Sequence, residues 1–289
     1  MTISAAYVQG RCGLSFELFP PKTEAGEAAL LKHVERLLAF RPSYITCTYG
    51  AGGSTRDKTL KITTRVKARF GVPVASHLTC VGATTEQLRQ YLAEARDRAV
   101  DDIVALRGDP PRGAASFQPV AGGLHYASEL VTLIRREFPQ FGIAVAGYPE
   151  KHQEAPSLEV DIDNLRRKVD CGADVVITQL FYNNDDFFRF RARCRQAGIG
   201  VPIVPGLLPI TSLAQIERIT SLCGAHLPPA LVSRLAERDN PDWQAQVGID
   251  FATRQVEELL GAGVPGLHFY VLNQSQATSA VLSRVSLPR

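Results

Sequence analysis

A carboxylate lies inside one of the apolar, strand-like stretches of the sequence. Glu17 belongs to the segment 14–19, where burial would disfavour ionisation, raise the pKa and prepare the group to act as a general acid. A core carboxylate paired with an Arg or a Lys is the alternative. Because charged side chains are seldom fully buried without a partner or a purpose, we favour the functional interpretation.

A second group of chemically useful residues follows the segment 103–106. Arg107 supplies a fixed cation, Gly108 lets a backbone approach closely, and Asp109 supplies an acceptor carboxylate, before two prolines that stiffen the exit. This set suits a bound ligand. An internal Arg107–Asp109 pair that braces a turn explains it equally well.

Two side chains inside strand-like segments have a functional and a structural interpretation each. His77 is more typical of a hydrogen-bonded core residue than of a ligand contact. Gln179 ends an apolar segment with an amide that can donate and accept, as recognition of a heterocycle edge requires. Its structural interpretation is a bridge between neighbouring strands.

Charged residues also gather after residue 147. His152 and Glu154 are close enough to suggest a metal site, but no third ligand accompanies them, so we do not favour a metal. The basic run 166–168 would face different sides of a helix, which leaves one or two members to reach a phosphate. A fully solvated face is the default interpretation of such a run.

Eight strand-like segments, rich in β-branched and aromatic residues, alternate with helical patterns from end to end. The candidate strands are residues 14–19, 44–49, 74–79, 103–106, 143–147, 175–180, 203–205 and 266–272. Helical periodicity follows, as in residues 24–40 and in 84–98, where Thr84 and Gln87 suit a capping box. Additional helices are predicted at 212–223, 229–238 and 243–260.

This alternation favours an α/β fold, a single (β/α)8 TIM barrel, over an open doubly wound sheet, which has the same βαβα order. The 289 residues suit one barrel. No G-x-G-x-x-G follows an early strand, and the nearest glycine-rich stretch, residues 50–54, lacks the third glycine. Barrel enzymes carry their chemistry at the C-terminal ends of the strands, where the polar residues above fall.

Composition excludes several classes of protein. A net charge of +3 with interspersed signs gives no basic stripe, so nucleic acid is not an expected partner. The sequence has no signal-like N-terminus and no uninterrupted apolar run of about 18 residues, so we expect a cytoplasmic protein without membrane contact. Six cysteines without a C-x-x-C pair indicate reduced, structural thiols. Both a monomer and a homo-oligomer are compatible with these features.

Seven separated segments, taken in order, resemble the methylenetetrahydrofolate reductase family, in its bacterial form with a catalytic barrel alone. They are residues 16–22, 48–51, 77–80, 105–110, 148–150, 177–181 and 268–273. The likeness covers about residues 14–273, and an ordered set is far more specific than any one motif. It raises the functional interpretation of the strand-end residues above the structural one.

The resemblance implies a barrel that binds FAD noncovalently, with residues 1–289 forming a single FAD-binding catalytic domain. It implies no metal. Arg167 and Lys168 would then serve the diphosphate. The FAD contacts carried over by matching motif are Tyr49, His77, Arg107, Gly108, Asp109, Tyr126, Ala127, Tyr148, His152, Asp161, Asn164, Arg167 and Lys168.

The same resemblance implies a ping-pong oxidoreductase in which NADH or NADPH reduces the flavin and leaves. Methylenetetrahydrofolate then takes the hydride to give methyltetrahydrofolate, whose methyl group feeds methionine synthesis. Glu17 matches the catalytic acid, and Asp109 matches a catalytic residue that contacts flavin and folate. The substrate contacts would be Thr48, Asp109, Gln179, Tyr270 and Gln274.

One departure from the family concerns the folate tail. Gln274 stands where some relatives carry an Arg or a Lys that holds the glutamate tail, so tail recognition is expected to be weaker or to use another residue. Two other functions stay open: a flavin-free barrel lyase for a phosphorylated small molecule, and a flavin- or folate-binding subunit without turnover. The lyase would need a strand-end lysine for a Schiff base, which we do not find.

Overall fold

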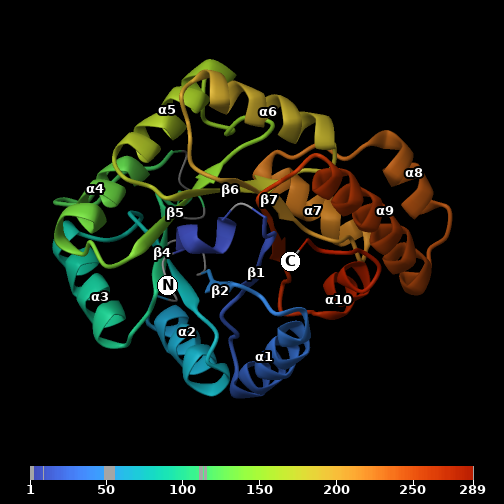
Figure 1. Ribbon diagram of the computed structural model, residues 1–289, viewed down its shortest axis with the longest axis horizontal. Coiled ribbons are helices and arrows are strands. Elements are labelled where there is room, and N and C mark those ends of the chain that lie inside the picture. The colour runs from blue at the N-terminus through green and yellow to red at the C-terminus, as the bar shows by residue number, and fades with distance from the viewer. Residues whose placement is uncertain (1–2, 9, 49–55, 111–112, 114–115, 289) are drawn as a thin grey trace.

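The computed structural model describes residues 3–8, 10–48, 56–110, 113 and 116–288. Its centre is a closed barrel of eight parallel strands in sequence order, in which β8 pairs with β1 (Figure 1). The predicted (β/α)8 barrel is confirmed, and the open doubly wound sheet is excluded. The strands are β1 Gly13–Leu18, β2 Tyr44–Cys47, β3 Val74–Thr79, β4 Asp102–Leu106, β5 Gly142–Gly147, β6 Val175–Leu180, β7 Ile203–Leu207 and β8 Gly266–Tyr270.

The helices form a ring outside the barrel (Figure 1). They are α1 Glu24–Leu37, α2 Arg56–Phe70, α3 Thr85–Asp97, α4 Ala127–Glu137, α5 Leu158–Asp170, α6 Asn184–Gln196, α7 Leu213–Cys223, α8 Pro229–Ala236, α9 Pro241–Gly261 and α10 Gln276–Leu282. The predicted capping box is confirmed. The hydroxyl of Thr84 accepts from the backbone N–H of Gln87, and the side-chain oxygen of Gln87 accepts from the backbone N–H of Thr84. The additional helices between β7 and β8 are also confirmed.

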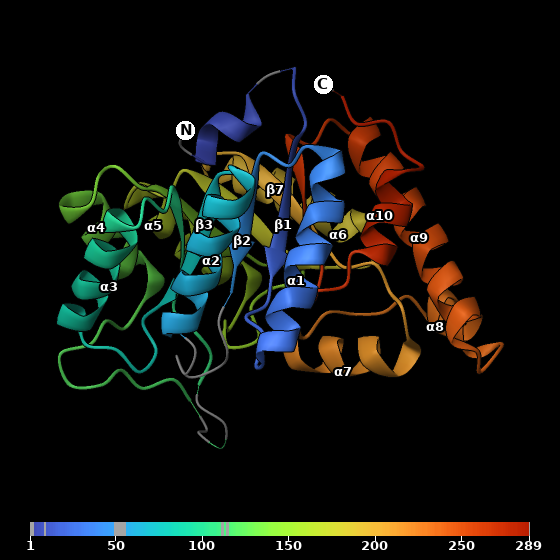
Figure 2. The same cartoon turned by 90° about the horizontal axis from the view of Figure 1, so that it is seen from below.

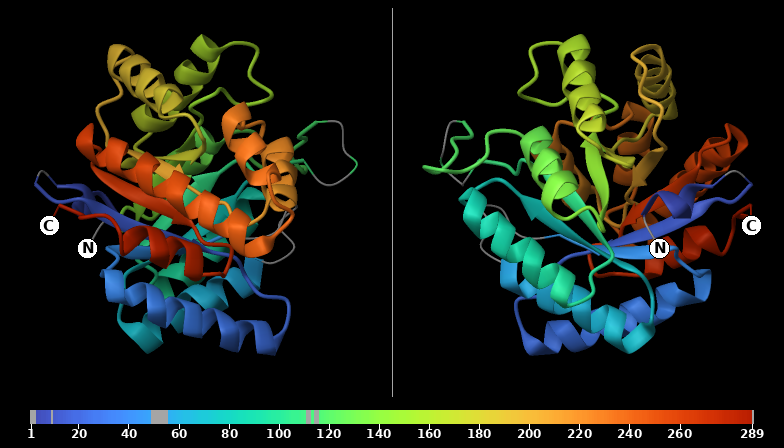
Figure 3. Two further views of the ribbon diagram at one scale, coloured as in Figure 1. Left: turned by 90° about the vertical axis from the view of Figure 1, so that its right-hand side faces the viewer. Right: turned by 60° about the vertical axis from the view of Figure 1, so that its left-hand side comes forward.

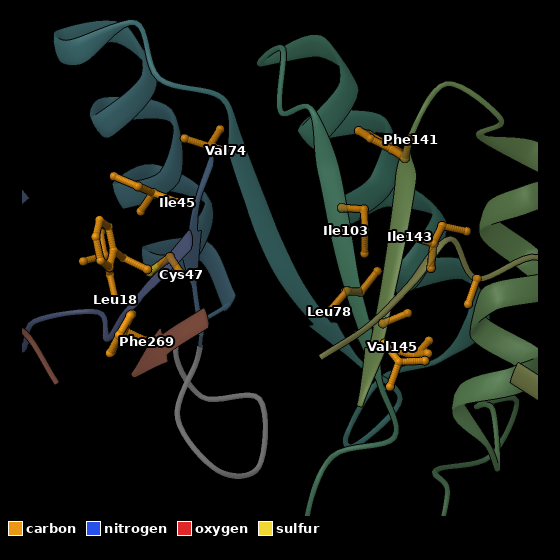
Figure 4. Close-up of a cluster of buried hydrophobic side chains, with 14 of the residues drawn as sticks. Leu18, Ile45, Cys47, Val74, Leu78, Ile103, Phe141, Ile143, Val145 and Phe269 are labelled. Atoms are coloured by element: carbon orange, nitrogen blue, oxygen red, sulfur yellow. The ribbon is translucent and has the colours of Figure 1, made fainter. Parts of the chain in front are cut away.

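Two layers of buried side chains fix the barrel. Because side chains alternate along a strand, one set points outward against the helices and the other fills the interior. The outward layer includes Leu18, Ile45, Leu78, Ile143 and Phe269, all buried (Figure 4). Near the strand N-termini the inward layer is mostly apolar, apart from Asp102, and toward the strand C-termini it turns polar. The alternation therefore places the polar residues in one mouth.

The other end of the barrel is closed by a short 3₁₀ helix, η1 Ile3–Tyr7, which lies at the opposite end from α7 (Figure 2). The backbone N–H of Ile3 donates to Asp102 over 2.8 Å, and the hydroxyl groups of Tyr7 and Tyr44 share a hydrogen bond. Burial raises the pKa of Asp102 to about 7. Among the described residues, η1 covers this end, so the C-terminal mouth is the expected place for a ligand to enter.

Strand β7 extends two residues beyond its predicted end. Proline and glycine usually mark strand ends, which is why the pattern stopped at Pro205. In the structure the N–H of Gly206 donates to the hydroxyl of Thr178 over 2.9 Å, and the register of β6 and β7 shifts there. A Cβ atom at Gly206 would lie 2.1 Å from the carbonyl oxygen of Thr178, so only glycine fits.

Candidate active site

The inward set of side chains at the strand ends brings Glu17, His77 and His268 together. Register pairs Glu17 of β1 with Tyr270 of β8, so His268, two residues earlier, faces the same interior. An oxygen of Glu17 lies 3.3 Å from Nε2 of His77 and 3.5 Å from Nε2 of His268. Nδ1 of His268 is 2.8 Å from the hydroxyl of Ser15. A chain of polar groups thus runs beneath the mouth.

The pKa of Glu17 differs from the sequence-based prediction. Burial by itself raises the pKa, as predicted, but the electrostatic attraction and hydrogen bonds of His77 and His268 outweigh burial and hold the pKa at about 2. The prediction of a raised pKa is therefore wrong for the ligand-free protein. The sequence could not show that two imidazoles from distant strands flank this carboxylate. A proton taken up here belongs to the cluster rather than to one residue.

His77 has an unfilled hydrogen-bonding capacity. It is buried, its Nε2 is taken up by Glu17, and its Nδ1 has no hydrogen-bond partner among the described residues. A buried polar atom left without a partner costs free energy, so such atoms usually face a ligand or water. The interpretation of His77 as a satisfied core histidine is therefore not supported, and the ligand-contact interpretation gains.

Tyr270 and Gln179 line the same mouth. The hydroxyl of Tyr270 donates to the carbonyl of Thr178 over 2.7 Å, and its ring meets His268 edge-on at 5.2 Å. The side-chain oxygen of Gln179 accepts from the N–H of Leu180, and no described residue accepts from its amide nitrogen. Gln179 therefore does not bridge two strands, and its amide nitrogen is available to a ligand.

After β4, Arg107 has a different partner from the predicted one. Its guanidinium holds Glu154 through two bonds of 2.6 and 2.7 Å and lies 4.9 Å from the ring centre of Phe117. The internal pair with Asp109 is not formed, and Asp109 is exposed. Gly108 has a φ of 89°, and a Cβ there would lie 2.6 Å from Val81. Glycine is required where the chain turns into the mouth.

The end of β5 and helix α5 form a second part of the site. Tyr148 and His152 meet edge-on at 4.6 Å, and Asp161 accepts from the N–H of His152 over 3.0 Å. The ammonium of Lys168 donates to the carbonyl of Ala146 over 2.6 Å. Burial lowers the pKa of Lys168 to about 8, against the opposing charge of Asp161. An anion placed here would satisfy the remaining donors of the ammonium.

The basic run 166–168 on α5 divides as its helical spacing predicts. Arg166 pairs with Asp163 at 3.4 Å and stays in solvent, whereas Lys168 reaches the strand end. Arg167 is exposed, with no ion pair among the described residues. The default of a fully solvated face is wrong for Lys168.

The other predicted site residues lie around the rim. Tyr126, 63% exposed, is the N-cap residue of α4, which begins at Ala127. Asn164 on α5 and Gln274 after β8 are exposed, while the N–H of Thr48 donates to the carbonyl of Leu18. Tyr49 lies outside the described residues. No group of three metal-ligating side chains occurs in the described part of the chain, and no described helix is long and apolar enough to cross a membrane.

Sequence reasoning missed Ser15, His268 and Glu154 as parts of the site. A signal existed for the first two, because each lies two residues before a predicted site residue on the same strand and must share its face. Glu154 was noticed only as a candidate metal ligand. Its pairing with Arg107 depends on the loop after β5, which has no periodic pattern.

Comparison with known proteins agrees with this geometry. The sequence model of the family described as "Methylenetetrahydrofolate reductase" matches residues 2–286. The chain belongs to this family. The 5,10-methylenetetrahydrofolate reductase of Escherichia coli is 39% identical over 280 residues, which cover 96% of this chain and 92% of that protein.

Plant members of the family are longer. Methylenetetrahydrofolate reductase (NADH) 1 of Arabidopsis thaliana is 38% identical over 296 residues, covering 99% of this chain and 50% of the plant protein. The chain thus spans about half the length of the plant relatives. A Clostridium thermocellum protein, solved with two copies of 5-methyl-5,6,7,8-tetrahydrofolic acid, has a similar fold with a TM-score of 0.64 and 16% identity, over 98% of each chain.

Proposed function

We propose that this chain reduces methylenetetrahydrofolate to methyltetrahydrofolate with NADH or NADPH and a noncovalent FAD, acting as one catalytic barrel. The observation that carries the proposal is the carboxylate of Glu17 between two buried imidazoles, at the mouth of a barrel that belongs to this family. The product's methyl group would serve methionine synthesis.

The residues present fit FAD in three respects. Buried His77 offers a ring nitrogen, Nδ1, without a partner, Gly108 leaves the turn after β4 without a side chain, and Lys168 holds an ammonium at the end of β5. Lys168 and Arg167 would bind the diphosphate of FAD, because charge-assisted hydrogen bonds to phosphate are stronger than hydrogen bonds between neutral groups. Exposed Tyr126 offers a flat apolar surface to a ring. When bound, FAD would supply the hydride acceptor and donor that no side chain provides.

Glu17 would deliver the proton that the folate half of the reaction needs. With a pKa of about 2 the carboxylate is ionised in the free protein, so it cannot start as a simple acid. A flat ligand over the mouth would exclude water and disfavour the charged form, which moves a proton of the cluster onto Glu17. Protonation of a nitrogen in the bridging ring of methylenetetrahydrofolate would then help that ring to open to an iminium cation.

Asp109 and Gln179 would position and stabilise the reacting folate. Burial raises the pKa of Tyr148, and the negative charge of Asp109 raises it further, which supports a place for Asp109 near the mouth. An anion beside a developing iminium stabilises that cation as it forms. The amide nitrogen of Gln179 would donate to whichever flat substrate occupies the mouth. One site would serve both substrates in turn.

We expect the purified protein, given FAD and NADH or NADPH, to convert methylenetetrahydrofolate to methyltetrahydrofolate. Chromatographic detection of the methylated product measures this directly, and omission of FAD from protein stripped of flavin is the control. Absence of product at saturating FAD with both nucleotides would overturn the proposed function.

A further inference from the structure

The first and last strands of the barrel reach the mouth together. Strands β1 and β8 pair through residues 13–17 and 266–270, so the two ends of the chain lie side by side (Figure 3). The final backbone bond between them runs from the N–H of Val271 to the carbonyl of Glu17 over 3.3 Å. Glu17 therefore lies where the regular pairing stops, and the contacts just beyond it decide how firmly its carboxylate is placed.

Beyond Glu17 the pairing cannot continue through backbone groups. In a continued parallel ladder the N–H of Phe19 would donate to the carbonyl of Val271. That carbonyl instead accepts from the N–H of Gln274 over 2.7 Å, which closes a tight turn. The two residues after Phe19 are prolines and have no N–H to donate. The exit of β1 therefore needs a partner other than the backbone of β8.

The side chain of Asn273 supplies this partner. Its Oδ1 accepts from the N–H of Phe19 over 2.9 Å, and its Nδ2 donates to the carbonyl of Phe19 over 2.6 Å. An amide side chain carries an acceptor and donors, as a peptide group does, so it can pair with both backbone groups of one residue. Asn273 thus extends the pairing of β1 with the β8 side of the barrel by one step.

The turn that carries Asn273 has an unusual backbone. Leu272 and Asn273 have φ angles of 45° and 58°, both in the left-handed region. Two positive φ angles at the centre of a closed turn are typical of type I′, which favours Asn or Gly. Asn273 suits its position, but Leu272 is unfavourable in this region. Such strain persists only where surrounding contacts hold it, and it is typical of functional sites.

The far side of the turn is fixed as well. The hydroxyl of Ser275, which is buried, shares a hydrogen bond of 3.0 Å with Nδ1 of His33 on α1. The same nitrogen lies 3.3 Å from the backbone N–H of Ser275. Because Ser275 ties the end of the turn to α1, the turn is a firm support from which Asn273 holds Phe19.

We propose that Asn273 is a positioning residue for the folate half-reaction, which holds the exit of β1 and thereby keeps the carboxylate of Glu17 between His77 and His268. The inference rests on the proposed function. Asn273 acts through Phe19, two residues after Glu17 on the same strand, and it takes no part in the chemistry. Proton transfer depends strongly on placement, since an error of about 1 Å can cost about 10²-fold in rate. Reduction of the flavin by the nucleotide does not use Glu17 and should not depend on Asn273.

The test replaces Asn273 by glycine, which removes both bonds to Phe19 but adopts positive φ readily. We expect oxidation of the reduced flavin by methylenetetrahydrofolate to slow about 10- to 100-fold. Reduction of the flavin by NADH or NADPH, and the affinity for FAD, should keep their wild-type values. Asn273→Asp retains an acceptor for the N–H of Phe19 but has no donor for its carbonyl, so its rate should fall between the two. Stopped-flow absorbance of the flavin measures each half-reaction.

Asn240→Gly is the matched control. Asn240 also accepts from a backbone N–H, that of Trp243 over 2.9 Å, but it does so at the start of α9. Loss of that bond leaves the exit of β1 untouched, so both half-reactions should keep their rates. Equal slowing of the two half-reactions in Asn273→Gly, or wild-type rates in both, would overturn the inference.

Crystal structures of the wild type and of Asn273→Gly test the positioning without turnover. We expect the Glu17 carboxylate of the variant to leave its place 3.5 Å from Nε2 of His268. A carboxylate that keeps this place in the variant would contradict the inference. This comparison needs neither FAD nor folate, whereas turnover by the wild type tests the proposed function. The two ideas can therefore fail independently.

Discussion

Replacement of Glu17 by glutamine is expected to slow the folate half-reaction strongly while leaving reduction of the flavin by the nicotinamide nearly intact. Hydride transfer from the nucleotide needs no general acid, whereas opening of the folate ring needs a proton. General-acid assistance typically contributes about 10²–10⁴ in rate, so the folate step should slow by that factor. Stopped-flow absorbance of the flavin follows each half-reaction separately.

Asp102→Asn is the matched control for this experiment. Asp102 is also a buried carboxylate of a barrel strand, but it bonds Ile3 at the closed end, away from the mouth. An amide oxygen can still accept from that N–H, and we expect both half-reactions to keep their rates. If Glu17→Gln slowed the two half-reactions equally, or slowed neither, Glu17 would be a structural carboxylate.

Loss of Arg167 and Lys168 together is expected to weaken FAD binding more than a hundredfold. Lys168 is placed at the end of β5 by its bond to Ala146, and Arg167 beside it has no ion pair among the described residues. Each charge-assisted bond to a phosphate contributes about 1.5–3 kcal/mol, so two lost bonds give at least that change in affinity. Fluorescence titration of FAD into the protein stripped of flavin measures it.

Arg166→Ala controls for the loss of positive charge on α5. Arg166 is adjacent in sequence but pairs with Asp163 in solvent. We expect the Arg166→Ala variant to bind FAD with the affinity of the wild type. Unchanged FAD affinity in the Arg167→Ala, Lys168→Ala double variant would contradict this prediction and would mean that residues 166–168 do not bind the diphosphate.

The architecture was largely readable from the sequence because the signal is periodic and local. All eight strands were predicted, with ends displaced by up to two residues, as at β7, where Pro205 and Gly206 belong to a strand. Two short elements were not predicted, η1 and α10. The pattern of η1 is too short to carry a period, and its place under the barrel depends on Asp102, 99 residues away from Ile3.

The candidate site was readable in position but not in electrostatics. Side chains alternate along a strand, and barrel sites lie at the C-terminal ends of the strands. These two regularities predict that Glu17, Gln179 and Tyr270 lie in one mouth, where the structure places them. The predicted direction of the Glu17 pKa shift was wrong, because His77 of β3 and His268 of β8 reach Glu17 only through the closure of the barrel. Interactions between residues of distant strands cannot be predicted from alternation along a strand or from the residues at its end.

The measurement that tests the central claim most directly is the visible absorbance of the wild-type protein with FAD, followed without oxygen through two successive additions. The proposed function predicts that NADH or NADPH bleaches the flavin, and that methylenetetrahydrofolate added afterwards restores the absorbance as methyltetrahydrofolate forms. A protein that binds no FAD, or a bleached flavin that stays bleached after the folate is added, would contradict it.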